Sequence, residues 1–230
     1  MVPSACCQVD PSERLAEVTL QGEPYSVLVN KFPLFQRHML LVSRRWRPQL
    51  LTAPDIAAVH ALCAESGLFA YFNSWCAGAS VNHLHLHIID EPPPLCALPL
   101  DLETAGGTLQ ARGYPAHHVV FPLPAGIPQL ALALDALIAA NYPHNLVLSP
   151  TAGYLVPRSR DPELRGRFHV PHEIDIGGPE FCGVFTAYTE AAVAALTQEC
   201  IETAYRETSV QLERRGCSGD RGLAPRSSRL

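Results

Sequence analysis

The chain has 230 residues, of which 17 are basic and 22 acidic, so its formal net charge is −5. This balance excludes mechanisms that depend on general attraction to a phosphate backbone, such as non-specific nucleic-acid binding. Apolar residues make up 47% of the chain and charged residues 17%, which is typical of a folded globule. No apolar run approaches the roughly 20 residues that a membrane span needs. We therefore expect a cytoplasmic protein that binds neither nucleic acid nor membrane.

The first ordered stretch, residues 25–90, is predicted as two strands, a helix and two further strands. Thr52 and Pro54 form the start signal of the helix, a cap residue followed by an early proline. Apolar residues then recur at helical spacing until Gly67. The predicted elements cover residues 25–30, 38–43, 52–67, 68–72 and 81–89.

A proline-rich connector, residues 91–110, separates this stretch from a second one, because its three consecutive prolines remove backbone donors. The second stretch, residues 111–205, is predicted as a strand, a helix, a hairpin and a final helix. This order nearly repeats that of the first stretch and suggests a weak internal duplication. Residues 206–230 are rich in Arg, Ser and Gly and are predicted to be disordered. The elements of the second stretch cover residues 117–121, 128–141, 145–148, 154–156 and 186–205.

The sharpest chemical feature is the tract of alternating histidines from His83 through His85 to His87. In a strand, successive side chains point to opposite faces, so the three imidazoles share one face. The intervening leucines point to the other face, into a core. Three imidazoles on one face are costly to bury and have little structural use, which favours a functional role.

Two functional interpretations of this tract compete. Three neutral imidazoles could bind a transition metal such as zinc, although none of the eight cysteines forms a C-x-x-C pair to complete such a site. Alternatively, one imidazole is a nucleophile that its neighbours orient. A histidine nucleophile suits attack at phosphorus, because the phosphoramidate that it forms can be transferred onward.

The flanking sequence resembles the histidine-triad superfamily, specifically its nucleotidyltransferase and phosphorylase branch. Residues 30–33 and 38–42 look like those of dinucleoside tetraphosphate phosphorylases, also called ATP adenylyltransferases. The tract over residues 79–87 looks closer still to GDP-D-glucose phosphorylase. Residues 144–148 and 156–160 resemble the C-terminal region of these phosphorylases. The resemblance implies an α+β fold, in which an antiparallel sheet with packed helices is built from two histidine-triad-like halves.

The resemblance also assigns roles to individual residues. His85 matches the nucleophile, His83 would orient it, and His87 would contact the phosphate that is transferred. A turn of small residues before the tract would let backbone N–H groups approach phosphate oxygens, as a nest does. The residues expected to bind substrate are Lys31, Asn73, Gly78, Ala79, Ser80, Asn82 and Arg158.

The implied function is cleavage of a dinucleoside polyphosphate or nucleoside-diphosphate sugar through a covalent nucleotidyl–histidine intermediate, with inorganic phosphate as acceptor. No metal is required for the covalent step, although Mg²⁺ could accompany a polyphosphate substrate. Several related phosphorylases have glutamine where this chain has His87, so a hydrolase that uses water as acceptor stays an alternative. A zinc-binding protein and a nucleotide-binding module without catalysis are the alternatives from other classes. A homodimer is compatible with this family.

Overall fold

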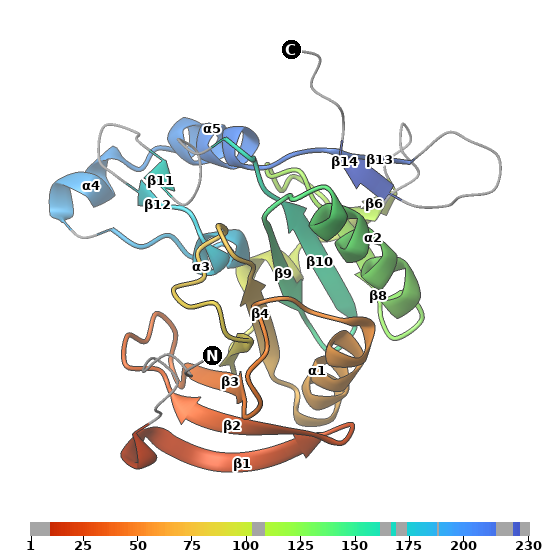
Figure 1. The fold of residues 1–230 in the computed structure, drawn as a ribbon. Helices are drawn as coiled ribbons and strands as arrows, with labels where there is room; N and C mark the ends of the chain where they lie inside the picture. The colour runs from red at the N-terminus through yellow and green to blue at the C-terminus, as the bar shows by residue number, and fades with distance from the viewer. Residues whose placement is uncertain are drawn as a thin grey trace.

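Ten antiparallel strands form one continuous sheet through the molecule (Figure 1). The computed structural model describes residues 10–102, 109–161, 167–168, 174–187, 189–214 and 223–225. Across the sheet the strands follow the order β1-β2-β3-β5-β4-β9-β10-β8-β7-β6. Their bounds are β1 Arg14–Leu20, β2 Glu23–Val29, β3 Met39–Ser43, β4 Phe69–Asn73, β5 His85–Ile89, β6 Leu100–Leu102, β7 Leu109–Ala111, β8 Val119–Pro122, β9 His144–Leu148 and β10 Ala152–Pro157.

Helices and two short hairpins surround this sheet. Among the described residues, no helix is both long and apolar enough to cross a membrane. The helical segments are η2 Pro11–Glu13, α1 Ala53–Ser66, η3 Pro94–Ala97, α2 Ile127–Ala139, α3 Gly178–Cys182, α4 Glu190–Ala195 and α5 Gln198–Thr208. The short hairpins pair β11 Arg167–Phe168 with β12 Ile174–Asp175, and β13 Leu212–Arg214 with β14 Leu223–Pro225.

The sheet consists of two halves that meet where β4 pairs with β9. Each half contributes a strand, a helix and two further strands in chain order, β3-α1-β4-β5 in the first and β8-α2-β9-β10 in the second. Within each half the last strand lies between the other two, so the strand order is the same when counted from either end of the sheet. The elements predicted for both halves are confirmed, although residues 81–84 belong to the loop before β5.

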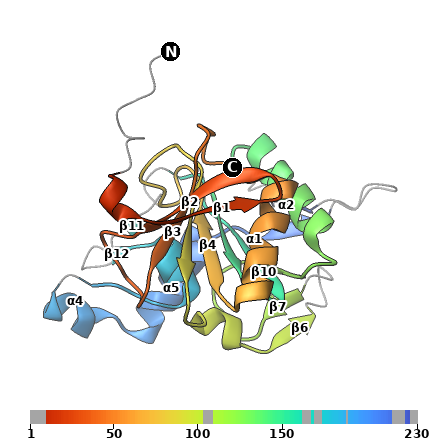
Figure 2. The ribbon, with the colours of Figure 1, turned by 90° about the horizontal axis from the view of Figure 1, so that it is seen from below.

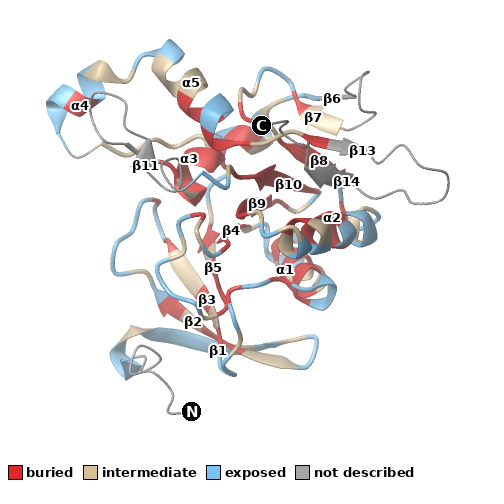
Figure 3. Cartoon of the chain, turned by 45° about the horizontal axis from the view of Figure 1, so that its top comes forward, coloured by how far each residue is buried: buried red, intermediate tan, exposed pale blue. Residues whose placement is uncertain are grey.

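The two faces of the sheet carry different layers. Helices α1 and α2 lie next to one another on one face, where they pack on Leu84, Leu86 and Ile88 in the larger core (Figures 1 and 2). Helix α3 lies on the other face beside β4 and β9 and is buried throughout (Figure 3). The predicted α+β class with an antiparallel sheet and packed helices is confirmed, and the alternation of β5 turns the histidine tract toward the α3 face.

The C-terminal part differs from the sequence prediction. The single helix expected over residues 186–205 is two helices, because Thr189 and Thr197 each accept a hydrogen bond from a backbone N–H and so cap α4 and α5 separately. The segment expected to be disordered from residue 206 onward begins inside α5 and continues into β13. Leu212 of β13 is buried in the larger core and so holds this segment against it, although the segment is mostly polar in composition.

The pattern also fails to indicate the two ends of the sheet. Strand β1 is an edge strand that is largely exposed, so its apolar side chains do not alternate cleanly with polar ones. Strands β6 and β7 fall at the end of the stretch expected to be an irregular connector, and each has only three residues. Such short edge strands carry too little periodicity to be recognised.

A buried carboxylate fixes the start of α1 to the segment that connects β3 with α1. Asp55 accepts hydrogen bonds from the backbone N–H and hydroxyl of Thr52 and from both terminal nitrogens of Arg47, at 2.6–2.9 Å. The Tyr25 hydroxyl donates to the same carboxylate at 3.0 Å. Burial raises the pKa of Asp55, but the hydrogen bonds from Arg47 and Thr52 lower it overall. The backbone carbonyl of Arg47 in turn accepts the backbone N–H of Leu84, which lies within the histidine tract.

We predict that Asp55→Ala lowers the free energy of unfolding by about 3 kcal/mol, because it leaves the donor groups of three residues without their shared acceptor. Thr52→Ala should cost only about 1 kcal/mol, the typical value of a helix cap. Urea denaturation of both variants measures the difference. Equal losses in the two variants would contradict the role given to Asp55.

Candidate functional site

His85 lies at the start of β5 with its ring held by the main chain. Its Nδ1 is 2.7 Å from the carbonyl oxygen of His83, so Nδ1 carries the proton. A neutral imidazole has a single N–H, and Nε2 therefore keeps its lone pair. This is the tautomer that a nucleophilic imidazole needs. The contact between His83 and His85 therefore runs through the His83 backbone carbonyl and not through the His83 imidazole.

Gln49 fixes the backbone on which His85 stands, and sequence reasoning missed it. Its side-chain oxygen accepts the backbone N–H of His85 at 2.9 Å, and its Nε2 donates to the His85 carbonyl at 2.9 Å. The same Nε2 donates to the carbonyl of Asn73 at 2.9 Å. One buried amide therefore joins the start of β5 to the end of β4, and Asn82 completes the arrangement by accepting the Gln49 N–H at 3.0 Å.

The His83 imidazole contacts β3. Its Nε2 donates to the carbonyl of Ser43 at 2.7 Å, which leaves Nδ1 as an acceptor that is buried without a hydrogen-bond partner. This contact holds His83, near the end of the loop before β5, against β3. The carbonyl of the same residue accepts from His85.

A chain of hydrogen bonds defines the tautomer of His87. The backbone N–H of Leu34 donates to Nδ1 of His38 at 3.2 Å, so the proton of neutral His38 is on Nε2. That Nε2 lies 2.9 Å from Nδ1 of His87, its shortest contact, with the Tyr71 hydroxyl and the Asn30 amide both at 3.2 Å. His87 then carries its own proton on Nε2 and can donate it to a ligand. His38 is a further residue of the site, and its place in the sequence, directly before β3, did not indicate this role.

Burial keeps the imidazoles of the site neutral. It lowers the pKa of His38 to about 4 and lowers the pKa of His85. The pKa of His87 falls well below its ordinary value, first through burial and then through the proximity of His85 and His38. The His87 ring also stacks on Tyr71 with ring centroids 4.3 Å apart. Neutral rings with fixed tautomers present one lone pair, on His85, and one N–H, on His87.

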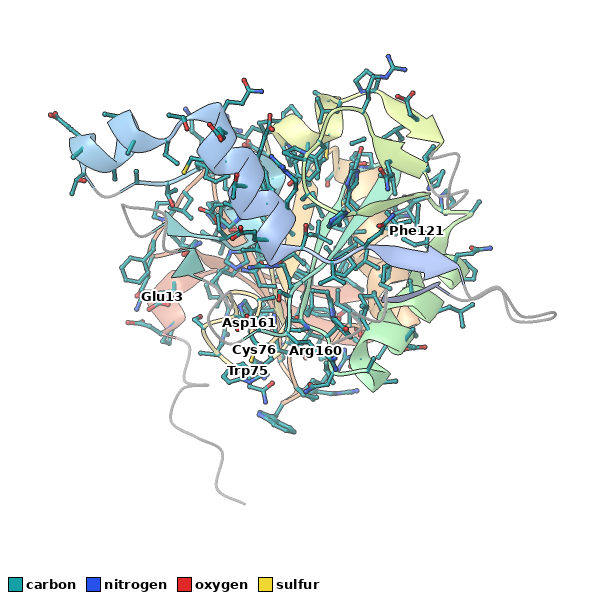
Figure 4. All side chains as sticks on the ribbon, turned by 90° about the horizontal axis from the view of Figure 1, so that it is seen from above. Glu13, Trp75, Cys76, Phe121, Arg160 and Asp161 are labelled. Carbon is teal, nitrogen blue, oxygen red and sulfur yellow. The ribbon has the colours of Figure 1, made fainter. Side chains whose placement is uncertain are left out.

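The loop of residues 74–84 carries the turn of small residues past this site. Trp75 and Cys76, labelled in Figure 4, begin it. Gly78 has a φ of +100°, a conformation that favours glycine, and it approaches the Asn73 side chain. The buried Asn145 amide donates to Oδ1 of Asn73 at 2.8 Å and to the carbonyl of Ala77 at 2.9 Å. Asn145 of β9, in the second half of the sheet, thus helps to shape the loop of residues 74–84 in the first half.

Arg158 is buried and does not have the position expected of a substrate phosphate ligand. Its side chain is 1% exposed, and Nη1 donates to Oδ1 of Asn145 at 2.9 Å and to the carbonyl of Ile176 at 3.0 Å. Its Nε donates to the carbonyl of Thr208 at 3.0 Å, and the guanidinium packs over the Phe181 ring. Burial lowers the pKa of Arg158 to about 10, which the negative charge of Glu180 opposes. Arg158 therefore positions other site residues from behind.

Two grooves meet at the histidine tract. The first, of about 880 Å³, runs over β2 and β3 and is lined by apolar side chains such as Leu28 and Val42, with Lys31 at its edge. The second, of about 670 Å³, extends toward α3 and is lined by Asn73, Gly78 and the residues that follow β12. The residues that line both grooves are Asn30, Phe32, Ser80, His85 and His87. A substrate that fills both grooves would have its midpoint at His85.

The structure brings most of the predicted substrate-binding residues to these grooves. Ser80 faces both grooves, while Ala79 lies half-buried beside it on the loop. The Lys31 ammonium is exposed and paired with Glu13 at 2.5 Å, which raises the pKa of Lys31. Asn82 faces Gln49 and supports the loop rather than a groove. Asn73 and Gly78 line the second groove, as described above.

The metal-binding interpretation receives no support from the geometry of the tract. Within the described part of the chain, no group of three or more His, Cys, Asp or Glu side chains is arranged to hold a metal ion. The ring nitrogens of His83 and His85 that carry protons are directed at backbone carbonyls. The imidazoles are therefore oriented for hydrogen bonding.

Comparison with known proteins agrees with the geometry. Residues 11–104 match the family described as the Ap4A phosphorylase N-terminal domain. The resemblance to the nucleotidyl phosphorylase branch is confirmed. GDP-D-glucose phosphorylase 1 of Danio rerio is a distant homologue, 30% identical over 161 residues, which cover 62% of this chain and 45% of that protein. The chain thus spans about half the length of this curated relative.

Solved structures of yeast Ap4A phosphorylase Apa2 share the fold. One superposes with a TM-score of 0.66 at 22% identity and covers 90% of this chain and 83% of its own. The complex with AMP gives a TM-score of 0.64 at 22% identity, with 81% and 73% covered. The complex with Ap4A gives 0.62 at 24% identity, with 82% and 74% covered. The shared fold therefore extends beyond residues 11–104, the segment that matches the family model.

We predict that any reaction of the His85 imidazole persists to unusually low pH. A lowered pKa means that the ring stays neutral, and so keeps its lone pair, below the pH at which an ordinary imidazole takes up a proton. The acid midpoint of the rate of His85 modification by diethyl pyrocarbonate, followed by peptide mass spectrometry, should lie below 6.5. A midpoint at or above 6.5 would show that burial does not control this ring.

Gly178 provides a second prediction, because its backbone lies directly against β4. A Cβ at this position would overlap the Tyr71 ring and Oδ1 of Asn73, whereas a Cβ on Gly177 would lie 3.6 Å from the nearest side-chain atom, in ordinary contact. We expect Gly178→Ala to lower the melting temperature by several degrees and Gly177→Ala to change it little. Thermal unfolding of the pair measures this, and similar behaviour of both variants would contradict the close approach of α3.

Proposed function

We propose that this chain transfers a nucleoside monophosphoryl group through a covalent intermediate on His85, from a dinucleoside polyphosphate or nucleoside-diphosphate sugar to inorganic phosphate. The observation that carries the proposal is the position of His85, with Nδ1 tied to the His83 carbonyl and the ring at the junction of two grooves. The match to the Ap4A phosphorylase N-terminal domain supports the same reaction class.

The chemistry balances without a further reactant. The Nε2 lone pair attacks the α-phosphorus, a P–N bond forms, and the P–O bond to the rest of the substrate breaks with its electron pair on the departing phosphate oxygen. In the second step an oxygen of inorganic phosphate attacks the same phosphorus and the P–N bond breaks. The products are a nucleoside diphosphate and the departing phosphate compound. Such transfers depend on positioning and on donors to the phosphoryl oxygens.

The first groove suits the nucleoside. Its floor is apolar, and two aromatic side chains stand exposed at its walls, Phe32 with 82% and Trp46 with 65% of its surface accessible. Exposed aromatic faces bind nucleobases by stacking without selecting one base. The cations at its edge are already paired with acidic residues, as Lys31 is with Glu13 and Arg44 with Glu17 at 2.6 Å. We therefore assign the base and ribose to this groove.

His87 and Ser80 are placed to bind the phosphoryl group that is transferred. Both line both grooves, so an α-phosphate at the junction would be within their reach. The Nε2–H of His87 can donate to a phosphoryl oxygen or to the departing oxygen, and the Ser80 hydroxyl can donate to another. Because burial lowers the pKa of both His85 and His87, these rings contribute directional hydrogen bonding rather than net charge.

We predict that wild-type protein mixed with substrate in the absence of phosphate gains the mass of one nucleoside monophosphoryl group, located on His85. A suitable panel holds diadenosine tetraphosphate, ATP, GDP-glucose and UDP-glucose. His85→Ala should form no adduct and lose turnover by at least about 10³-fold, because the nucleophile is absent. His60→Ala is the matched control, since His60 is buried on α1.

The fate of the intermediate separates the related possibilities. Phosphate-dependent formation of a nucleoside diphosphate supports the phosphorylase, whereas a nucleoside monophosphate formed without phosphate would make the chain a hydrolase. Binding of nucleotide with neither adduct nor turnover would overturn the proposal in favour of a binding module.

A further inference from the structure

The second groove contains a buried carboxylate that the transfer chemistry does not use. Glu180 of α3 is 3% exposed and lines this groove, together with Thr186. One carboxylate oxygen accepts the backbone N–H of Gly177 at 2.8 Å, and the other accepts the Thr186 hydroxyl at 3.1 Å. The contact with Gly177 caps the start of α3, and the carboxylate also borders the groove, where it can meet a ligand.

The charge of this groove opposes that of a polyphosphate. None of the described residues that line it is a lysine or an arginine, whereas Lys31, Arg14 and Arg44 line the first groove. Arg158 interacts electrostatically with Glu180, but it is buried and does not line the groove, so it offers no contact to a phosphate there. Two or three further phosphates in this groove would meet a carboxylate at low dielectric and would be repelled.

The polar groups of the groove match a neutral polyol instead. A carboxylate accepts hydrogen bonds from hydroxyls, and each of its oxygens can accept more than one. Asn73 has its Oδ1 bonded to Asn145, so its amide nitrogen is the part that can donate to a hydroxyl oxygen. The walls of this groove thus offer an acceptor on Glu180, a hydroxyl on Thr186 that can donate or accept, and a donor on Asn73. The groove has a volume of about 670 Å³, which is large enough for a hexose.

We propose that Glu180 and Thr186 recognise the hydroxyls of a sugar and thereby select nucleoside-diphosphate hexoses over dinucleoside polyphosphates. The proposal rests on the transfer reaction at His85. The phosphate joined to the sugar would lie at the junction, where His87 and Ser80 line both grooves, and the sugar ring would lie beyond it toward α3. Inorganic phosphate would later occupy the junction alone, away from the carboxylate.

The test compares substrates that share a base. The kcat/KM values are measured for ADP-glucose against diadenosine tetraphosphate and for GDP-glucose against diguanosine tetraphosphate. Wild type should prefer the sugar nucleotide by at least about tenfold within the pair whose base it accepts. Glu180→Gln should reduce kcat/KM for the sugar nucleotide by about tenfold or more, the usual effect of losing a charged hydrogen bond, while the value for the tetraphosphate stays the same or rises.

Controls separate recognition from folding. Glu190→Gln makes the same change of charge on the exposed surface of α4 and should leave the preference unchanged. Thr186→Val provides a second variant if Glu180→Gln lowers the melting temperature, since it removes one hydroxyl and keeps the carboxylate. The rate of adduct formation on His85 is recorded for every variant and substrate.

The outcomes distinguish the two proposals. A preference for the tetraphosphate, or an equal loss for both substrates in Glu180→Gln, with the adduct still formed on His85, would overturn sugar recognition and leave the transfer reaction standing. No adduct with any substrate would overturn both.

Discussion

Asn73 and Asn145 face one another in the antiparallel pairing of β4 with β9, and their buried side chains are joined at 2.8 Å. A buried amide whose partner is missing costs free energy, so this pair favours one register of the seam over its alternatives. The seam joins the two halves into one sheet and also anchors the loop before the histidine tract, because Asn145 holds the Ala77 carbonyl. Arg158 completes the set by donating to the other side of Asn145. Register, loop and nucleophile therefore share one buried hydrogen-bond network.

The sequence predicts those parts of this arrangement that depend on local periodicity. Alternation along β5 places His83, His85 and His87 on one face, and the spacing of apolar residues with the Thr52 cap locates α1. These features are set by residues a few positions apart, which is the range over which a pattern can be recognised. The order of elements in both halves follows for the same reason.

The remaining features depend on contacts between residues far apart in the chain. The sequence assigns no role to Gln49 or His38, and they join the site because β3 pairs with β5 and a loop folds back on it. Arg158 lies in a polar stretch that suggests an exposed phosphate ligand, yet the packing of α3 and α5 encloses it. Glu180 gave no signal, because a single carboxylate in a glycine-rich segment is common. Its significance comes from the groove that α3 borders.

The two halves differ in the connection between their last two strands, and the proposed site lies beside this connection in the first half. In the second half β9 and β10 are joined by residues 149–151, a tight turn in which the Ser149 N–H donates to the Ala152 carbonyl and the Ser149 hydroxyl oxygen accepts the Ala152 N–H. In the first half the equivalent connection is the loop of residues 74–84, which carries the small-residue turn and ends at the histidines. The described residues of this turn line neither groove, so the second half acts as a support. It supplies Asn145, Arg158 and, through the segment after β12, the wall of the second groove. In the proposed reaction one half supplies the nucleophile and the other half supports it, so the specificity of the reaction can change in the supporting half while His85 stays fixed.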